Sequence, residues 1–174
     1  AKRVSERTGI PHISTGNYFR KLGELDTLLA RDIKQTMDAG QLVSDQQTLE
    51  IVRVMLAENA CKTRGALFDG YPRNLTQAAD LEQIMVEMRE RIDIAPLLEI
   101  RQEVGEQRIL GRARQEGRTD DNLETARARY KVYMEQTFPL VKYYADKGML
   151  YRIDGGKGMD AVTSELEELL QKYI

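Results

Sequence analysis

The stretch Gly65-Ala-Leu-Phe-Asp-Gly-Tyr-Pro-Arg-Asn-Leu-Thr-Gln77 joins a short apolar run to a charged turn. The run is typical of a buried strand, and the Gly and Pro that follow it do not continue a sheet ladder. Ligands of open α/β sheets bind beyond the carboxyl ends of the strands, where Asp69 and Arg73 would lie. The guanidinium of Arg73 suits a phosphate, and the carboxylate of Asp69 suits a hydrated Mg²⁺. The alternative is an ordinary turn whose charges face water.

Composition restricts the classes of protein that fit. The chain has 174 residues, 31% of them charged, and a net charge of −2, so a single domain without a basic field is expected. Nucleic acid is therefore not an expected partner. The single cysteine, Cys61, excludes an intramolecular disulfide and favours a reducing, cytoplasmic compartment. No apolar run approaches the roughly 20 residues of a membrane span, so no membrane partner is expected.

A second segment is expected to meet the same edge of the sheet. Residues 10–14 have the pattern of a strand, and a helix capped by Asn17 is predicted to follow. Thr15 and Arg20 would then face an anion at the start of that helix. His12, the only histidine, is assigned a structural role because no carboxylate partner for it is apparent in the sequence.

Strands and helices alternate along the rest of the chain. Residues 1–8 have the pattern of the end of a helix closed by Gly9, and residues 96–100 and 150–153 are further candidate strands. This alternation predicts a parallel sheet covered on both faces. Within the helix expected over residues 25–37, the apolar positions at helical spacing are Leu25, Leu28, Leu29, Ile33 and Met37.

Basic residues are densest between residues 108 and 129, and Asp120 and Asp121 lie among them. The six arginines are Arg108, Arg112, Arg114, Arg118, Arg127 and Arg129. So many guanidiniums repel one another unless anions or carboxylates lie between them. The alternative is a solvated helix surface on which these arginines pair with Glu106, Glu116 and Glu124.

Several ordered motifs along the chain resemble those of the adenylate kinases. They are Ile-Ser-Thr-Gly-Asn-x-x-Arg (13–20), Gln-Leu-Val-x-Asp (41–45), Asp-Gly-Tyr-Pro-Arg-x-x-x-Gln (69–77), Arg-x-x-Gly-Arg (108–112), Gly-Arg-x-Asp-Asp (117–121) and a closing Asp-Gly turn (154–155). The brief segment between Arg112 and Arg118 has no cysteine and is similar to the short-lid form of the family.

The resemblance implies an α/β fold, a P-loop NTPase-like doubly wound parallel sheet with strand order 2-3-1-4-5. It implies transfer of the terminal phosphoryl group of Mg-ATP to AMP, giving two ADP. Residues 1–174 would form one nucleoside monophosphate kinase domain, with an AMP-binding insertion at 14–43, a short lid at 111–121 and the remainder as core. We expect a cytoplasmic monomer whose partners are ATP, AMP and ADP and whose cofactor is Mg²⁺.

Site residues follow from the same motifs. Those implied to bind AMP are Thr15, Arg20, Gln41, Leu42, Val43, Gly70, Tyr71, Pro72, Arg73, Gln77, Arg118 and Arg129. Those implied to bind ATP are Arg108, Arg112 and Lys157. The arginines implied to act in catalysis are Arg73, Arg112, Arg118 and Arg129. Asp69 would hold the metal through water.

Two departures from the family pattern qualify this expectation. Asn17 stands where the family usually has Asp, and a neutral amide would hold a Mg²⁺-bound water less strongly. The family's first strand and its loop G-x-x-x-x-G-K-[ST/G] would directly precede Ala1, and the 174 residues contain no match to that loop. The turn at residues 155–158 is no substitute, because it follows the last strand and has a different spacing.

Without that loop, activity would be impaired or absent, because the loop supplies the N–H groups and the lysine that hold the ATP phosphates. A non-catalytic AMP-binding remnant or interaction module is therefore one alternative. A kinase for UMP or CMP is another, although Thr15 and Gln77 favour adenine.

Overall fold

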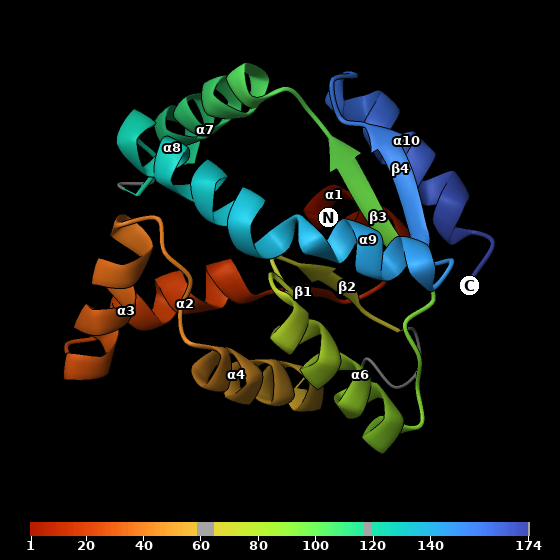
Figure 1. The fold of residues 1–174 in the computed structure, drawn as a ribbon, viewed down its shortest axis with the longest axis horizontal. Helices are drawn as coiled ribbons and strands as arrows, with labels where there is room; N and C mark the ends of the chain where they lie inside the picture. Colours follow the sequence, from red (N-terminus) through yellow and green to blue (C-terminus); the bar gives the residue numbers. More distant parts are fainter. Residues whose placement is uncertain (59–64, 117–119, 174) are drawn as a thin grey trace.

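The computed structural model describes residues 1–58, 65–116 and 120–173, in which helices surround two short parallel sheets (Figure 1). The helices are α1 (Lys2–Thr8), α2 (Thr15–Gly23), α3 (Leu28–Asp38), α4 (Asp45–Glu58), α6 (Leu75–Met88), α7 (Gln102–Glu116), α8 (Leu123–Val132), the π-helical turn η1 (Tyr133–Thr137), α9 (Pro139–Asp146) and α10 (Met159–Leu170). No helix within these ranges combines the length and the hydropathy that crossing a bilayer requires.

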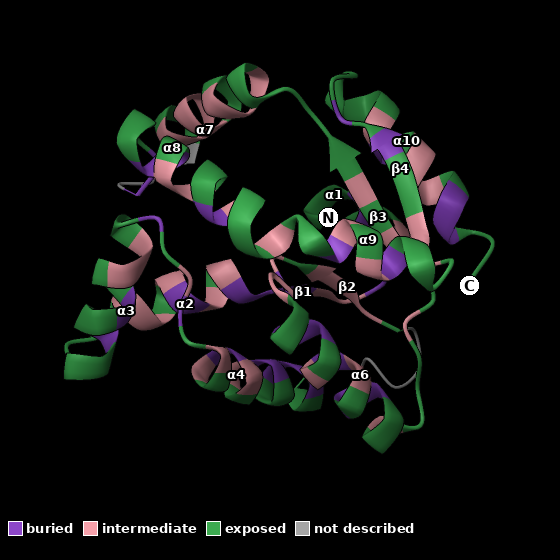
Figure 2. Cartoon of the chain, in the orientation of Figure 1, coloured by how far each residue is buried: buried purple, intermediate pink, exposed green. Residues whose placement is uncertain are grey.

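The four described strands form two parallel pairs. They are β1 (His12–Ser14) with β2 (Leu67–Asp69), and β3 (Ala95–Glu99) with β4 (Leu150–Asp154). Parallel strands that alternate with helices confirm the predicted α/β class. No strand in the described part of the chain joins β2 to β3, so the order β1-β2 and β3-β4 matches the expected order with its first strand left out. Burial varies along the second pair, because Leu98 of β3 and Tyr151 of β4 are exposed whereas Ile153 of β4 is fully buried. Figure 2 shows this mixture of exposed and less exposed residues on β3 and β4.

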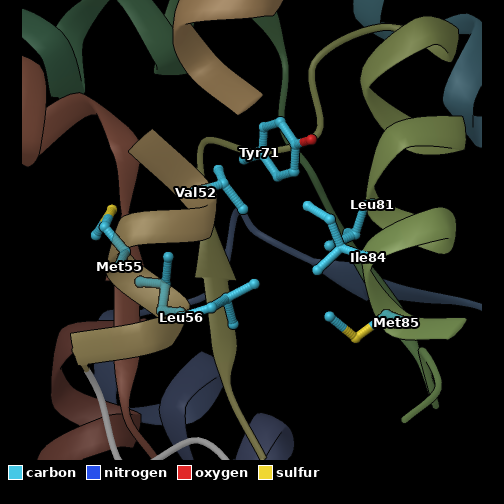
Figure 3. Packing of buried hydrophobic residues seen from close by; sticks show 8 residues of the cluster. Val52, Met55, Leu56, Tyr71, Leu81, Ile84 and Met85 are labelled. Atoms are coloured by element: carbon cyan, nitrogen blue, oxygen red, sulfur yellow. The ribbon is translucent and has the colours of Figure 1, made fainter. Parts of the chain in front are cut away.

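The largest core cluster lies between α4 and α6 and includes Ile13 of β1. Its other members, shown in Figure 3, are Val52, Met55, Leu56, Tyr71, Leu81, Ile84 and Met85. A second cluster joins Ala78 of α6 to Leu140 and Tyr144 of α9, and α9 also contacts β4. The helix α9 therefore packs against both halves of the structure.

Helix starts account for two differences from the sequence predictions. The side chain of Ser14, not that of Asn17, caps α2 by accepting a hydrogen bond from the Asn17 backbone N–H. Thr27 caps α3, so this helix begins at Leu28, and its buried side chains are Ala30 and Ile33. The apolar positions in residues 25–37 do not form one buried stripe, because Leu25, Leu28 and Leu29 are exposed. The predicted cap at Gly9 is confirmed by its left-handed backbone, with φ of 73°.

The end of α3 is anchored to α8. The hydroxyl of Thr125 donates to the backbone carbonyl of Asp38 at 3.0 Å. Gly40 has φ of +73°, and a Cβ built there would lie 3.0 Å from the Cβ of Ala128. The backbone therefore approaches α8 more closely at Gly40 than a larger residue would allow.

Candidate functional site

Arginines from three helices converge on two buried aspartates that precede α8. Arg112 of α7 holds Asp121 with two hydrogen bonds, from Nε to Oδ2 at 2.6 Å and from Nη2 to Oδ1 at 3.0 Å. Arg129 of α8 donates to Asp121 Oδ1 and to Asp120 Oδ2, both at 2.5 Å. Arg20 of α2 lies with Nη1 3.6 Å from Asp120 Oδ2. Figure 1 shows how α7 and α8 face α2 across this region.

The charge state of Asp121 follows from its partners. Burial raises the pKa of this carboxyl, but hydrogen bonds from Arg112 and Arg129 outweigh burial and hold its pKa below the usual value. Asp121 is therefore ionised at neutral pH, and it fixes two guanidiniums in one place.

Arg73 lies within the field of the same cluster. Desolvation lowers the pKa of this guanidinium most, and positive charges on Arg129, Arg20 and Arg112 lower it further. The negative charge of Asp69 acts in the opposite direction. A phosphate placed among these guanidiniums would relieve their mutual repulsion.

The carbonyl of Gly70 positions two of the predicted site residues. It accepts hydrogen bonds from Thr15 Oγ1 at 3.0 Å and from Arg73 Nε at 2.9 Å. Gly70 has φ of +78°, and a Cβ built there would lie 2.9 Å from Arg73 Nη2. Because the Thr15 hydroxyl donates to Gly70, this hydroxyl offers a ligand only its acceptor lone pairs.

Two hollows meet at Leu42, Gly70 and Arg73. The smaller has a volume of about 40 Å³ and is lined by Thr15, Gly16, Phe19, Met37, Gln41, Leu42, Val43, Thr48, Gly70, Arg73 and Gln77. The larger has a volume of about 370 Å³ and is lined by Gly40, Leu42, Gly70, Tyr71, Pro72, Arg73, Arg129, Val132, Tyr133 and Thr137. The larger hollow falls in the usual range for small-molecule sites. The smaller holds one or two waters, so a base enters it only when its walls move apart.

Two of the residues implied to bind ATP, Arg108 and Lys157, come together from distant parts of the chain. Arg108 Nη2 donates to the backbone carbonyl of Lys157 at 3.4 Å. The ammonium of Lys157 pairs with Glu165 at 2.8 Å, which raises the pKa of this lysine. Arg108 and Arg112 both lie on α7, which runs without a break through Gly111, the first residue of the predicted lid.

Some predicted site residues have other surroundings. The expectation that His12 lacks a carboxylate partner is wrong, because His12 Nε2 lies 3.1 Å from Asp69 Oδ2. Tyr71 is 4% exposed and packs in the core cluster (Figure 3), although it also lines the larger hollow. Arg118 lies outside the described residues.

The predicted site did not include three acidic side chains, those of Asp120, Asp121 and Asp45. Asp120 and Asp121 stand within the basic segment, but the sequence did not show which arginines they hold. Asp45 accepts hydrogen bonds from Asn74 and Gln77. Its place in the Gln-Leu-Val-x-Asp motif was the available signal. Within the described ranges, no group of three or more His, Cys, Asp or Glu side chains is arranged to hold a metal ion.

Comparisons with known proteins identify the family. The family model described as adenylate kinase matches residues 1–149. An adenylate kinase from Kocuria rhizophila is 40% identical, over 99% of this chain and 91% of its own length. One from Thermotoga neapolitana is 35% identical over 98% of this chain and 90% of its own length, and one from Archaeoglobus fulgidus is 36% identical over 99% and 91%. On these matches and on the motifs that line the cleft, the chain belongs to the adenylate kinase family.

Proposed function

We propose that this protein transfers the terminal phosphoryl group of Mg-ATP reversibly to AMP, giving two ADP. The convergence of Arg20, Arg112 and Arg129 beside Arg73 is the observation that supports this reaction most directly. Phosphoryl transfer spreads negative charge over phosphate oxygens, and fixed guanidiniums stabilise that charge without reorganising. The aspartates keep these guanidiniums in place before substrate arrives.

The AMP side of the site comprises the hollows around Gly70. In this proposal the base enters between Thr15 and Gln77, and the backbone of residues 41–43 contacts it. Arg20 and Arg73 then bind the phosphate. Residues 14–43 would act as the AMP-binding insertion, which moves as the smaller hollow widens.

The ATP side is assigned to Arg108, Arg112 and Lys157, and by its motif Arg118 would clamp the transferring phosphates together with Arg129. Arg108 would stack on the adenine beside Lys157, and Arg112 would bind the phosphates together with Arg129. Residues 111–121 would form the short lid, whose closure excludes the water that would otherwise hydrolyse ATP. The alignment with the Thermotoga protein spans 198 positions, more than this chain contains, whereas that with the Kocuria protein spans 172. The first relative therefore carries residues that this chain lacks, in keeping with a short lid.

The metal ion fits a role in which substrate phosphates supply most of its ligands. Mg²⁺ commonly keeps several waters and binds one or two carboxylates, so the half-exposed Asp69 can contact it through water. When bound, Mg²⁺ neutralises charge on the ATP phosphates. Asn17 contributes less, because its side-chain oxygen already accepts a hydrogen bond from Arg20 Nη2 at 2.8 Å.

Binding without turnover is the second candidate function. It is favoured by the lining of the two hollows around Gly70, which includes none of the residues assigned to ATP, namely Arg108, Arg112 and Lys157. Under either function we expect a cytoplasmic monomer whose ligands are nucleotides.

Calorimetric titration with AMP and a coupled assay for ADP test the proposal together. Removing the guanidinium in Arg20→Ala should weaken AMP binding by about 10- to 100-fold, because hydrogen bonds to charged groups are worth about 1.5–3 kcal/mol. Arg53→Ala is the matched control, since Arg53 pairs with Glu87 on the surface and should leave binding unchanged.

The outcomes separate the candidates. AMP binding with ADP formation supports the kinase, and AMP binding without ADP formation supports the binding protein. Absence of AMP binding refutes both. Faster turnover of UMP or CMP than of AMP would replace the proposed substrate.

A further inference from the structure

We infer that Asp45 is a positioning residue that fixes the side-chain amide of Gln77 and thereby selects bases with an amino group over bases with an oxo group. The inference rests on the proposed function, in which Gln77 borders the base. It assigns a role to a side chain that lies outside the arginine cluster.

The amide of Gln77 can take only one of its two orientations. The Arg73 backbone N–H donates to Gln77 Oε1 at 2.8 Å, and Gln77 Nε2 donates to Asp45 Oδ1 at 2.8 Å. A backbone N–H can only donate and a carboxylate can only accept, so both partners require the same assignment of oxygen and nitrogen. Turning the amide over would set donor against donor and acceptor against acceptor. Gln77 is 2% exposed, so water could not compensate for these mismatches.

Asp45 is itself held in place by a neighbour of fixed polarity. Asn74 Nδ2 donates to the same Oδ1 of Asp45 at 2.9 Å. The side-chain oxygen of Asn74 caps α6 by accepting from the Gln77 backbone N–H at 2.8 Å, which fixes the Asn74 amide as well. Asp45 is also the first residue of α4, where the helix dipole favours a negative charge. The carboxylate of Asp45 therefore receives both donors without rearrangement.

This orientation determines which base edge Gln77 can bind. With these bonds made, the amide retains an acceptor lone pair on Oε1 beside a donor proton on Nε2. That pair complements an edge with an amino donor next to a ring-nitrogen acceptor, as in adenine and cytosine. Hypoxanthine, guanine and uracil present a carbonyl beside a ring N–H. In the same position, the base carbonyl would face Gln77 Oε1 and the ring N–H would face the Nε2 proton, so neither hydrogen bond could form. Thr15 adds a second acceptor, because its hydroxyl proton is given to Gly70.

The matched ligands are AMP and IMP, which differ at the purine only in the 6-amino and 6-oxo groups. The matched variants are Asp45→Ala and Asp45→Asn, made in the full chain. Both remove the charge at the start of α4, but the carbonyl of the Asn variant can still accept from Asn74 and Gln77. The measured quantity is the ratio of the dissociation constants for IMP and AMP, from calorimetry at one pH and salt concentration.

The wild type should bind AMP more tightly than IMP. Asp45→Ala should lower the ratio by about threefold to tenfold, the worth of a hydrogen bond that favours one orientation. Asp45→Asn should keep the ratio within about twofold of the wild type. An unchanged ratio in Asp45→Ala refutes the inference, and an equal fall in both variants shows that charge, not orientation, is responsible. Absence of AMP binding by the wild type refutes the proposed function instead.

Side-chain amide NMR on the wild type decides the matter even if Asp45→Ala does not fold. The hydrogen bond from Nε2 of the buried Gln77 side chain to Asp45 predicts one Gln side-chain amide whose protons exchange slowly with solvent. Fast exchange of every Gln side-chain amide would overturn the inference.

Discussion

Replacing Asp121 with Asn should destabilise the protein strongly. The Asp121 side chain has no exposed surface, and it accepts three hydrogen bonds from Arg112 and Arg129. Removing one partner of a buried ion pair typically costs about 3–5 kcal/mol, because the other charge stays buried and unpaired. The Asn variant keeps one acceptor oxygen, and the Arg112 side chain is 38% exposed and can be solvated in part. We therefore expect a loss of about 2–4 kcal/mol in the free energy of unfolding.

Thermal and urea unfolding of the full chain measure this loss. For a chain of this size the expected fall in Tm is about 5–15 °C. Asp146→Asn is the matched control, since Asp146 forms an exposed pair with Lys142 and should cost less than about 1 kcal/mol. Adding phosphate should restore part of the Tm of Asp121→Asn by binding the released guanidiniums. If the two variants lose the same stability, Asp121 does not hold the arginines as described.

Three further predictions concern the same molecule. Gly70→Ala places a Cβ 2.9 Å from Arg73 Nη2 at a backbone φ of +78°. The AMP affinity measured by calorimetry should therefore fall about tenfold or more, and an unchanged affinity would contradict the described geometry. The pKa of Asp121 is lower in the folded state than in the unfolded state, so the stabilisation by its charge is fully present above the unfolded pKa of about 4 and is lost as the pH falls further. The difference in unfolding free energy between wild type and Asp121→Asn should therefore be constant from pH 7 to 5 and should shrink below pH 4. Leu28→Ser should change the unfolding free energy by less than about 0.5 kcal/mol because Leu28 is exposed, whereas Ile33→Ala should lower it by about 2–5 kcal/mol because Ile33 is buried. Equal urea midpoints for the two variants would contradict this difference in burial.

Local signals in the sequence predicted the elements of the fold well. Gly9 closes α1, as predicted from its residue type. One error came where two local signals competed. Ser14 and Asn17 are both good caps, and only the structure shows that Ser14 is used.

Contacts between distant residues were harder to predict. Asp69 lies beside His12 because β1 and β2 pair in parallel with His12 opposite Leu67, a register that the sequence does not specify. The repulsion among the arginines of residues 108–129 predicts that anions or carboxylates lie between them. Which carboxylates hold them depends on how α2, α7 and α8 pack.

The anchor between α3 and α8 has a consequence for how the two nucleotides influence each other. Thr125 and Arg129 are one helical turn apart on α8. The helix that donates a hydrogen bond to the carbonyl of Asp38 therefore also carries the guanidinium that binds Asp121. Under the proposed function, AMP binding that shifts residues 38–40 would therefore also displace Arg129 through α8. Thermodynamic linkage makes such an influence mutual. If AMP binding changes the affinity for the second nucleotide by some factor, the second nucleotide changes the affinity for AMP by the same factor.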